Sequence, residues 1–252
     1  MLRRYLTMIV CFGFLTACGG GGGGGGGDQH IASTLTFQFK TAWGAYQQQS
    51  TIFPITLSGT ATNSTLGSYA ISGSGTVTQT SGISTQPNMN GLGGTVQAIM
   101  VTRVYQFTAL VHGNSIPQTL TDIAYYDPTS YAYMGGTFTD NTRSMVNNVL
   151  LQWSLPPDTV KCCIAGLGNS FYRTSFALNN PPTHDYLYTV TADTANSVFV
   201  NLIDYTAAGA NRSYRLDDTN TLKPVTENIN MAALVLVNGA PYSFNAAVTF
   251  NY

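Results

Sequence analysis

The chain has 252 residues, and only 8% of them are charged, about a third of the roughly 25% that is usual in globular domains. Its ten Lys and Arg residues nearly balance its eleven Asp and Glu residues. This balance argues against a nucleic-acid partner and against a basic membrane-binding face, because both require excess positive charge. Solubility must come from Ser, Thr, Asn and Gln side chains, as is typical of secreted β proteins.

The amino terminus has the order of a secretory signal. Arg3 and Arg4 precede the apolar run "YLTMIVCFGFL", which is shorter than the roughly 20 residues that a membrane-spanning helix needs. The run closes with "LTAC", in which Cys18 follows small residues. This motif resembles the lipobox of bacterial lipoproteins. The resemblance implies a signal peptide over residues 1–17, cleavage before Cys18, and acyl chains on Cys18 that anchor the protein stably in a membrane.

A run of glycine follows the cysteine. In lipoproteins an aspartate directly after the lipidated cysteine retains the protein at the inner membrane, so Gly19 implies an outer-membrane location by the same resemblance. We predict that residues 18–31 form a flexible tether, because glycine restricts the backbone least. No strand is expected before the run and no Lys-Ser/Thr follows it, which argues against a phosphate-binding loop.

Residues 32–252 are predicted to form a single all-β domain. The first segment, "STLTFQFKTAW" (residues 33–43), places Leu35, Phe37 and Phe39 on one face with the period of a half-buried strand. "SMVNNVLLQW" (residues 144–153) is the one helical candidate, and a strand is favoured there as well. Other strands are predicted at residues 53–60, 68–80, 96–112, 131–139, 170–178, 186–192, 197–205, 232–238 and 242–252. About a dozen such segments, separated by turn clusters, predict an antiparallel sandwich or open barrel.

Two pairs of segments are similar within the chain, which suggests a duplicated β unit. Residues 124–136 and 213–225 each combine a strand, an Asp-containing turn and a strand, and "LSGTATNS" is similar to "ISGSGTVT". Common hairpin chemistry explains the same similarity. The mature chain also weakly resembles uncharacterised secreted proteins and lipoproteins of betaproteobacteria, through residues 213–236 and through "LPPDTV" and "CCIAGLGNSFY". That resemblance implies no particular activity.

Cys162 and Cys163 are adjacent in "VKCCIAG". A disulfide between neighbours holds their Cα atoms about 3.8 Å apart or less, below the usual 4.4–6.8 Å, so it is strained. Two hypotheses stay open here: a vicinal disulfide, or two small side chains on opposite faces of a strand. The absence of a C-x-x-C motif argues against a zinc or thioredoxin-like site.

The remaining polar residues predict neither a metal site nor a catalytic site. The three histidines, His30, His112 and His184, have no metal-ligand spacing, and no G-x-S-x-G motif accompanies them. Glu227 is the sole glutamate, and aspartates such as Asp217 stand in turn contexts where the side chain caps the turn. No cofactor is predicted.

Tyrosines mark the predicted binding surface. The hairpin around "YYDPTSYAY" carries four of the fifteen tyrosines, and Tyr126 and Tyr131 are predicted to be exposed and to bind a glycan or protein ligand. The leading hypothesis is a lipid-anchored cell-envelope protein with a non-catalytic binding or structural role. One alternative is an envelope hydrolase that acts on carbohydrate. Another is an outer-membrane β-barrel, suggested by the aromatic carboxyl terminus "NAAVTFNY", although Arg103 in the middle of a long strand weighs against it.

Overall fold

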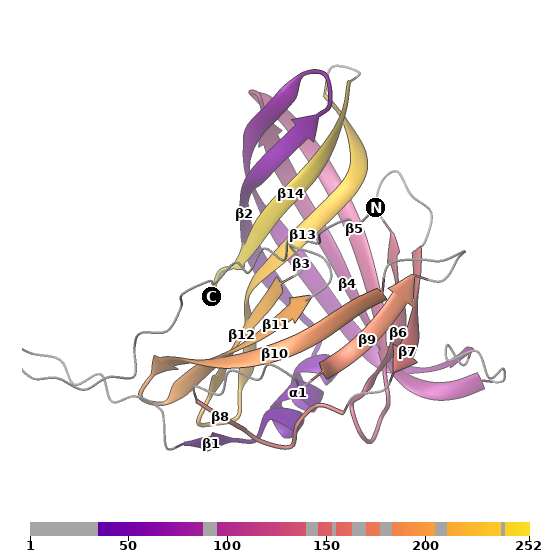
Figure 1. The fold of residues 1–252 in the computed structure, drawn as a ribbon, viewed down its shortest axis with the longest axis vertical. Coiled ribbons are helices and arrows are strands. Elements are labelled where there is room, and N and C mark those ends of the chain that lie inside the picture. The colour runs from indigo at the N-terminus through magenta and orange to yellow at the C-terminus, as the bar shows by residue number, and fades with distance from the viewer. Residues whose placement is uncertain are drawn as a thin grey trace, which may run out of the picture.

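The computed structural model describes residues 35–87, 95–139, 146–152, 155–162, 170–176, 183–204, 211–237 and 240–252. These residues form one helix and fourteen strands (Figure 1). The elements are β1 (Thr36–Phe37), α1 (Phe39–Gln48), β2 (Thr51–Asn63), β3 (Gly67–Pro87), β4 (Thr95–Val111), β5 (Asn114–Tyr126), β6 (Tyr133–Thr139), β7 (Val146–Gln152), β8 (Val160–Lys161), β9 (Ser170–Phe176), β10 (Thr183–Thr194), β11 (Ser197–Asp204), β12 (Asn211–Asp217), β13 (Leu222–Val237) and β14 (Ala240–Phe250).

The strands of the described chain pair in antiparallel fashion. β1 pairs with β8, and the other strands follow in the order β10-β11-β12-β13-β14-β2-β3-β4-β5-β6-β7-β9. Because β9 pairs with both β7 and β10, the pairing returns to its first strand as a closed barrel. The predicted all-β, antiparallel architecture of about a dozen strands is confirmed.

The barrel has a base and an upper lobe. We define the upper lobe as β2 and β14 together with residues 67–78 of β3, 104–111 of β4 and 114–121 of β5. In Figure 1 these strands rise above the rest of the molecule, whereas α1 and β1 lie at the opposite end. The base therefore holds the first described residues of the chain, and the hairpin turns of the upper lobe lie far from them.

The upper lobe is filled with apolar side chains. In β2 and β4 buried and exposed residues alternate, which places one face of each strand inside. The space is narrow at two glycines: a Cβ on Gly59 would lie 2.0 Å from the backbone oxygen of Asn245, and one on Gly75 would lie 2.1 Å from that of Gln106. Glycine is thus required at these two positions, because the backbone of the neighbouring strand lies too close for any side chain. The buried residues of the lobe include Ile55, Leu57, Ala61, Ile71, Val77, Phe107, Ala109, Val111, Phe244, Ala246 and Val248.

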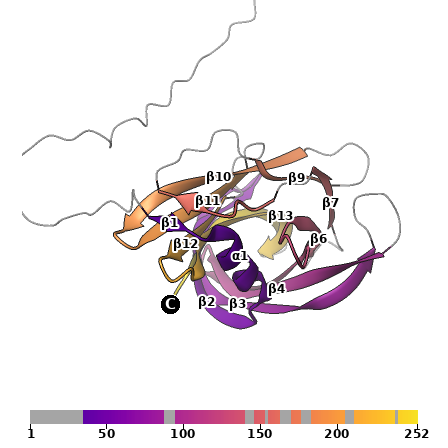
Figure 2. The ribbon, with the colours of Figure 1, turned by 90° about the horizontal axis from the view of Figure 1, so that it is seen from below.

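The prediction of one strand over residues 33–43 is wrong from Phe39 onward, where helix α1 begins. The same apolar residues also fit a helical period, because Phe39, Ala42, Trp43 and Tyr46 are spaced three or four residues apart and all four are buried. Seen from below, α1 lies inside the ring of strands (Figure 2). The stabilisation gained when this helical face is buried inside the barrel therefore outweighs the strand preference of the alternating sequence pattern.

The second ambiguous segment was predicted correctly. Residues 146–152 form strand β7, which pairs with β6 and β9. The strand is thus part of the closed ring.

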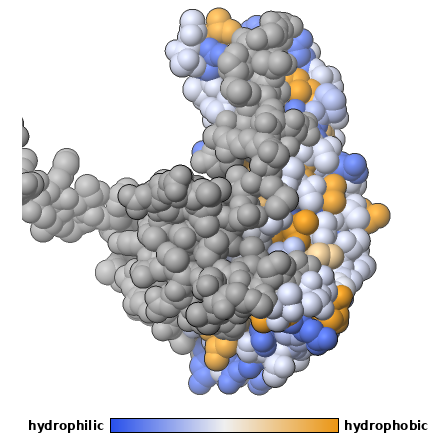
Figure 3. All heavy atoms as spheres, turned by 90° about the vertical axis from the view of Figure 1, so that its right-hand side faces the viewer, coloured by the Kyte–Doolittle hydropathy of each residue, from blue (hydrophilic) through white to orange (hydrophobic). Residues whose placement is uncertain are grey.

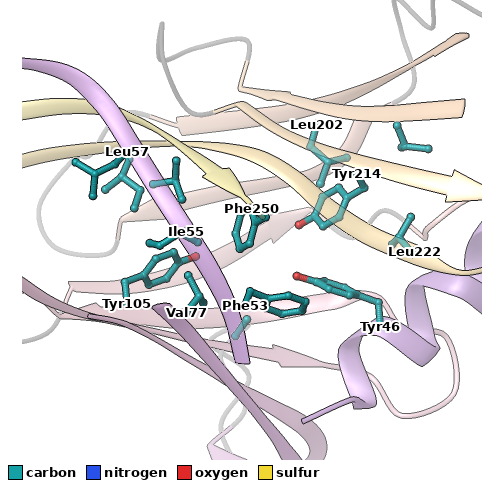
Figure 4. Close-up of a cluster of buried hydrophobic side chains, with 14 of the residues drawn as sticks. Tyr46, Phe53, Ile55, Leu57, Val77, Tyr105, Leu202, Tyr214, Leu222 and Phe250 are labelled. Atoms are coloured by element: carbon teal, nitrogen blue, oxygen red, sulfur yellow. The ribbon is translucent and has the colours of Figure 1, made fainter. Parts of the chain in front are cut away.

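Helix and strands meet in a continuous apolar core. Figure 4 shows Tyr46 of α1 and Tyr214 of β12 pointing toward one another, and their ring centroids are 5.4 Å apart. Trp43 lies edge-on to Tyr214 at 5.5 Å. The helix thus fills the base of the barrel and is held there by aromatic packing.

Candidate functional site

A network of charged and polar side chains crosses the interior between the upper lobe and α1. We call it the central network; it consists of Gln47, Gln79, Arg103, Tyr105, Asp122, Arg212 and Glu227. Arg212 Nε donates to Glu227 Oε1 at 2.6 Å, and the Tyr105 hydroxyl donates to Glu227 Oε2 at 2.7 Å. Glu227 of β13 therefore binds β12 beside it and β4 on another part of the ring.

Arg103 forms the other half of this network. Its Nε donates to Gln79 Oε1 and its Nη2 donates to Gln47 Oε1, both at 2.8 Å. Its Nη1 lies 3.5 Å from Asp122 Oδ2, and Arg212 Nη2 lies at the same distance from that oxygen. Asp122 thus joins the two arginines, and Gln47 connects the network to α1.

The electrostatics of the central network favour full ionisation of the arginines. Burial opposes the charge of Arg212, but the carboxylates of Glu227 and Asp122 outweigh it and hold its pKa well above the ordinary value. Burial and the nearby Glu227 carboxylate raise the pKa of Tyr105 well above its ordinary value, so the hydroxyl stays protonated and donates. Two arginines against two carboxylates give no net charge. The arrangement thus pairs both carboxylates with arginines.

The predicted exposure of Tyr126 is wrong. Its side chain is only 3% exposed and belongs to the core. The ring packs edge-on against Trp43 at 6.0 Å and against Tyr133 at 5.7 Å. Tyrosine combines a large apolar ring with one polar atom, so the sequence alone did not distinguish a core position from a binding position. Tyr126 holds α1 in place and is not positioned to bind a partner.

Tyr131 is half-buried and also contacts the helix. A Cβ on Gly44 would lie 2.4 Å from the Tyr131 ring, and Gln48 Nε2 donates to the Tyr131 hydroxyl at 3.4 Å. The backbone of Tyr131 has a φ of 57°, in the left-handed region. The ring therefore covers α1 where the helix has no side chain, and the structure brings Tyr126 and Tyr131 together as supports of α1.

The predicted Asp turns are confirmed. Asp127 Oδ1 accepts from the backbone N–H groups of Thr129 and Ser130 at 2.9 and 2.6 Å. Asp217 Oδ1 accepts from the backbone N–H groups of Thr219 and Thr221 at 3.0 and 2.9 Å. These aspartates stabilise turns.

The cysteine predictions are only partly reached by the structure. Cys162 is buried at the end of β8, while Cys163 lies outside the described residues, so the vicinal disulfide stays a hypothesis. Cys18 and His30 also lie outside the described residues. His112 is exposed in the turn between β4 and β5, as expected, where its ring lies 4.7 Å from that of Tyr69.

The outer face of the upper lobe is uncharged and rich in hydroxyl groups. None of residues 51–102, 104–121 and 228–252 is Asp, Glu, Lys or Arg. Thr56, Ser74 and Thr108 lie side by side on β2, β3 and β4. On the side of the molecule seen in Figure 3, pale residues of intermediate hydropathy predominate. The exposed polar residues of the lobe include Thr56, Ser58, Thr60, Thr62, Ser68, Ser72, Ser74, Gln106, Thr108, Ser115, Thr119, Asn245 and Thr249.

This surface was missed in the sequence analysis, although its signal is readable there. The uncharged stretch of residues 51–102 is long, and alternation assigns its Thr and Ser residues to one face. The interior positions of Arg103, which is buried, and of Arg212, which is half-buried, were missed as well. Arg103 shares the inward alternation of Val101 and Tyr105, and a charge on that face must find a partner inside.

No family model matches the chain, and no match was found among curated proteins or solved structures. In the part of the chain that the structure describes, no helix is long and apolar enough to cross a membrane. The described residues also contain no group of three or more His, Cys, Asp or Glu side chains placed to hold a metal ion.

Proposed function

We propose that this protein is a lipid-anchored cell-envelope protein with a non-catalytic binding role. Its proposed partner is uncharged, and a neutral glycan is the first candidate. The observation that carries the proposal is the upper lobe, a large outer surface of Thr and Ser side chains with no charged residue. A polyanion or polycation is recognised through side chains of opposite charge. A hydroxyl-rich surface instead exchanges hydrogen bonds with sugar hydroxyl groups, each of which donates and accepts.

The position of the lobe supports this role. The first described residues, Leu35 to Phe37, lie at the base, so a tether from Cys18 joins the domain at the end opposite the lobe (Figure 1). A domain tethered in this way presents its far end to the surroundings of the membrane. The lipid anchor and the outer-membrane location are part of the proposal and depend on the lipobox motif.

The hydrolase is the weaker alternative. A glycosidase needs two carboxylates that flank the scissile bond, one of them protonated. The two carboxylates of the central network, Asp122 and Glu227, are bound by Arg103 and Arg212 in the interior. The outer-membrane barrel is weaker as well, because β2 turns Ile55 and Leu57 inward and its Thr and Ser residues from position 56 onward outward, whereas strands in lipid do the reverse.

Co-sedimentation with insoluble polysaccharides tests the proposal. We expect the protein to sediment with a neutral polysaccharide in preference to acidic alginate beads, and equally at low and high salt, since uncharged contacts are not screened. The variant Thr56→Lys/Thr108→Lys places two charges on the lobe and should reduce sedimentation at least fivefold. The matched control Thr41→Lys/Thr191→Lys adds the same charge at exposed positions of the base and should bind normally. Preferential, salt-sensitive binding to alginate, or equal binding by both variants, would overturn the proposal.

A further inference from the structure

A cavity of about 280 Å³ lies at the rim of the base, away from the upper lobe. Two hairpin turns form it, the turn between β10 and β11 and the turn between β12 and β13. The turns are joined directly, because the backbone N–H of Asp218 donates to the backbone oxygen of Asn196 at 2.9 Å. The walls of the cavity are thus fixed relative to each other.

Two cations line the cavity, Arg215 of β12 and Lys223 of β13. Arg215 Nε is paired with Asp193 Oδ2 at 2.5 Å, and Arg215 Nη2 donates to Ser197 Oγ at 3.4 Å. Ser197, which is only 2% exposed, donates in turn to Asp193 at 2.6 Å. These bonds hold the Arg215 guanidinium in one orientation. Lys223 lines the same cavity, and in the described part of the chain no carboxylate lies within 4.0 Å of its Nζ.

The same β12–β13 hairpin also carries two carboxylates of the lining. Asp217 receives three hydrogen bonds on Oδ1, including one of 2.6 Å from the Thr219 hydroxyl, and none of these three bonds uses its Oδ2. Although partial burial opposes ionisation, these hydrogen bonds lower the pKa of Asp217, which therefore stays charged at neutral pH. Asp218 lines the cavity beside it, and within the described residues its carboxylate takes part in no ion pair.

We propose that this cavity binds a small zwitterion that carries a primary ammonium group and a phosphate or carboxylate group. The four charged residues of the lining, Arg215 and Lys223 against Asp217 and Asp218, sum to zero. A lone anion would also meet the two carboxylates and a lone cation would also meet the two cations, whereas a zwitterion pairs with both kinds of charge in this mixed lining. The hydroxyl and amide groups of Thr194, Asn196 and Thr221 complete a polar lining. The volume lies at the small end of the range for ligand pockets, which suits a molecule of this size.

Two kinds of molecule supply a zwitterion of this kind: a lipid with a phosphoethanolamine headgroup and a free amino acid. The headgroup is within reach, because the backbone N–H of Gln38 donates to Asn220 Oδ1 at 3.0 Å and so places the start of the described chain beside the cavity. If the predicted tether is correct, the stretch from Cys18 to about Ser33 reaches on the order of 20 Å. The inference is independent of the partner proposed for the upper lobe.

Isothermal titration of the purified full chain with O-phosphoethanolamine tests the inference. We expect saturable binding that weakens at least tenfold in Lys223→Gln and in Asp218→Asn. The matched controls Lys161→Gln and Asp158→Asn remove exposed charges outside the cavity and should bind as the wild type does. Melting temperatures of all four variants within a few degrees of the wild type exclude misfolding as the cause.

Comparison ligands test whether both charged groups of the zwitterion are required and distinguish a lipid headgroup from a free amino acid. Inorganic phosphate and ethanolamine should each bind at least tenfold more weakly, and phosphocholine, which has no N–H to donate, should do the same. Equal binding of phosphate alone, or equal binding of phosphocholine, would overturn the inference, as would the absence of heat with any zwitterion at millimolar concentration. Lys223-dependent flotation with phosphatidylethanolamine vesicles, but not with phosphatidylcholine vesicles, supports the headgroup as ligand. Tighter binding of glycine than of O-phosphoethanolamine supports a free amino acid.

Discussion

Replacement of Glu227 by alanine tests whether the central network stabilises the barrel as a buried ion pair. Glu227 is 8% exposed and accepts from both Arg212 and Tyr105, at 2.6 and 2.7 Å. Removal of one partner of a buried pair typically costs about 3–5 kcal/mol, because the other charge is left without compensation. After the substitution Arg212 is still partly solvated, because its side chain is 28% exposed, and it still has Asp122 as an ion-pair partner at 3.5 Å. We therefore expect a loss at the lower limit of this range, about 3 kcal/mol.

The expected loss is measurable by urea and thermal unfolding of the purified protein, followed by circular dichroism. For a domain of this size, about 3 kcal/mol corresponds to a fall in melting temperature of about 6–12 °C. The triple variant Tyr105→Phe/Arg212→Met/Glu227→Leu replaces the charged cluster by apolar groups and should recover to within about 1 kcal/mol of the wild type. Asp158→Ala, which breaks the exposed pair with Lys40 at 3.7 Å, serves as the control and should change nothing measurable. The prediction is refuted if the triple variant is as unstable as Glu227→Ala, or if Glu227→Ala costs under about 1 kcal/mol. Either result would mean that Glu227 and Arg212 do not stabilise the barrel as a buried ion pair.

Three further predictions follow from other residues. Gly44→Ala should destabilise the domain, because its Cβ would lie 2.4 Å from the Tyr131 ring, and Gly44→Ala/Tyr131→Ser should restore melting if that contact is the cause. The pKa of Asp217 is lowered in the folded state, so its contribution to stability is present above the unfolded-state pKa of about 3.9 and disappears as the pH falls through the folded-state value. The variant Asp217→Asn should therefore flatten the dependence of the unfolding free energy on pH between about pH 5 and pH 2. An unchanged pH dependence would contradict this. Cys18→Ser should abolish metabolic labelling with a fatty-acid analogue, and equal labelling of variant and wild type would refute lipidation.

The strands were predictable because their signal is local. Period-2 alternation of apolar and hydroxyl residues, as in β2, reflects the pleat of a single strand and needs no knowledge of its neighbours. Helix α1 was not predictable in the same way. Phe37 and Phe39 fit a strand, Phe39 and Trp43 fit a helix, and the choice depends on the interior of the barrel, which only the complete ring creates.

The central network and the cavity depend on contacts between distant parts of the chain. Arg103 binds Gln47 across 56 residues, and Tyr105 binds Glu227 across 122 residues. Spacing along the sequence carries no information on such pairs. The sequence did contain one clue, the isolated Arg103 on the inward face of an otherwise uncharged strand, which demanded an acceptor inside the fold.

The buried network also explains how an uncharged, glycine-rich strand keeps its register. β3 contains Gly, Ser and Thr at most positions, so its few large apolar residues specify its alignment with β4 only weakly. A slip of one residue would turn Arg103 and Gln79 to opposite faces, break their hydrogen bond of 2.8 Å and leave the arginine without its interior acceptors. The penalty for a buried, unpaired charge thus selects one register along the whole β3–β4 hairpin. The same register sets the rows of Thr and Ser on the upper lobe, so the charges inside the barrel determine the geometry of its uncharged outer surface.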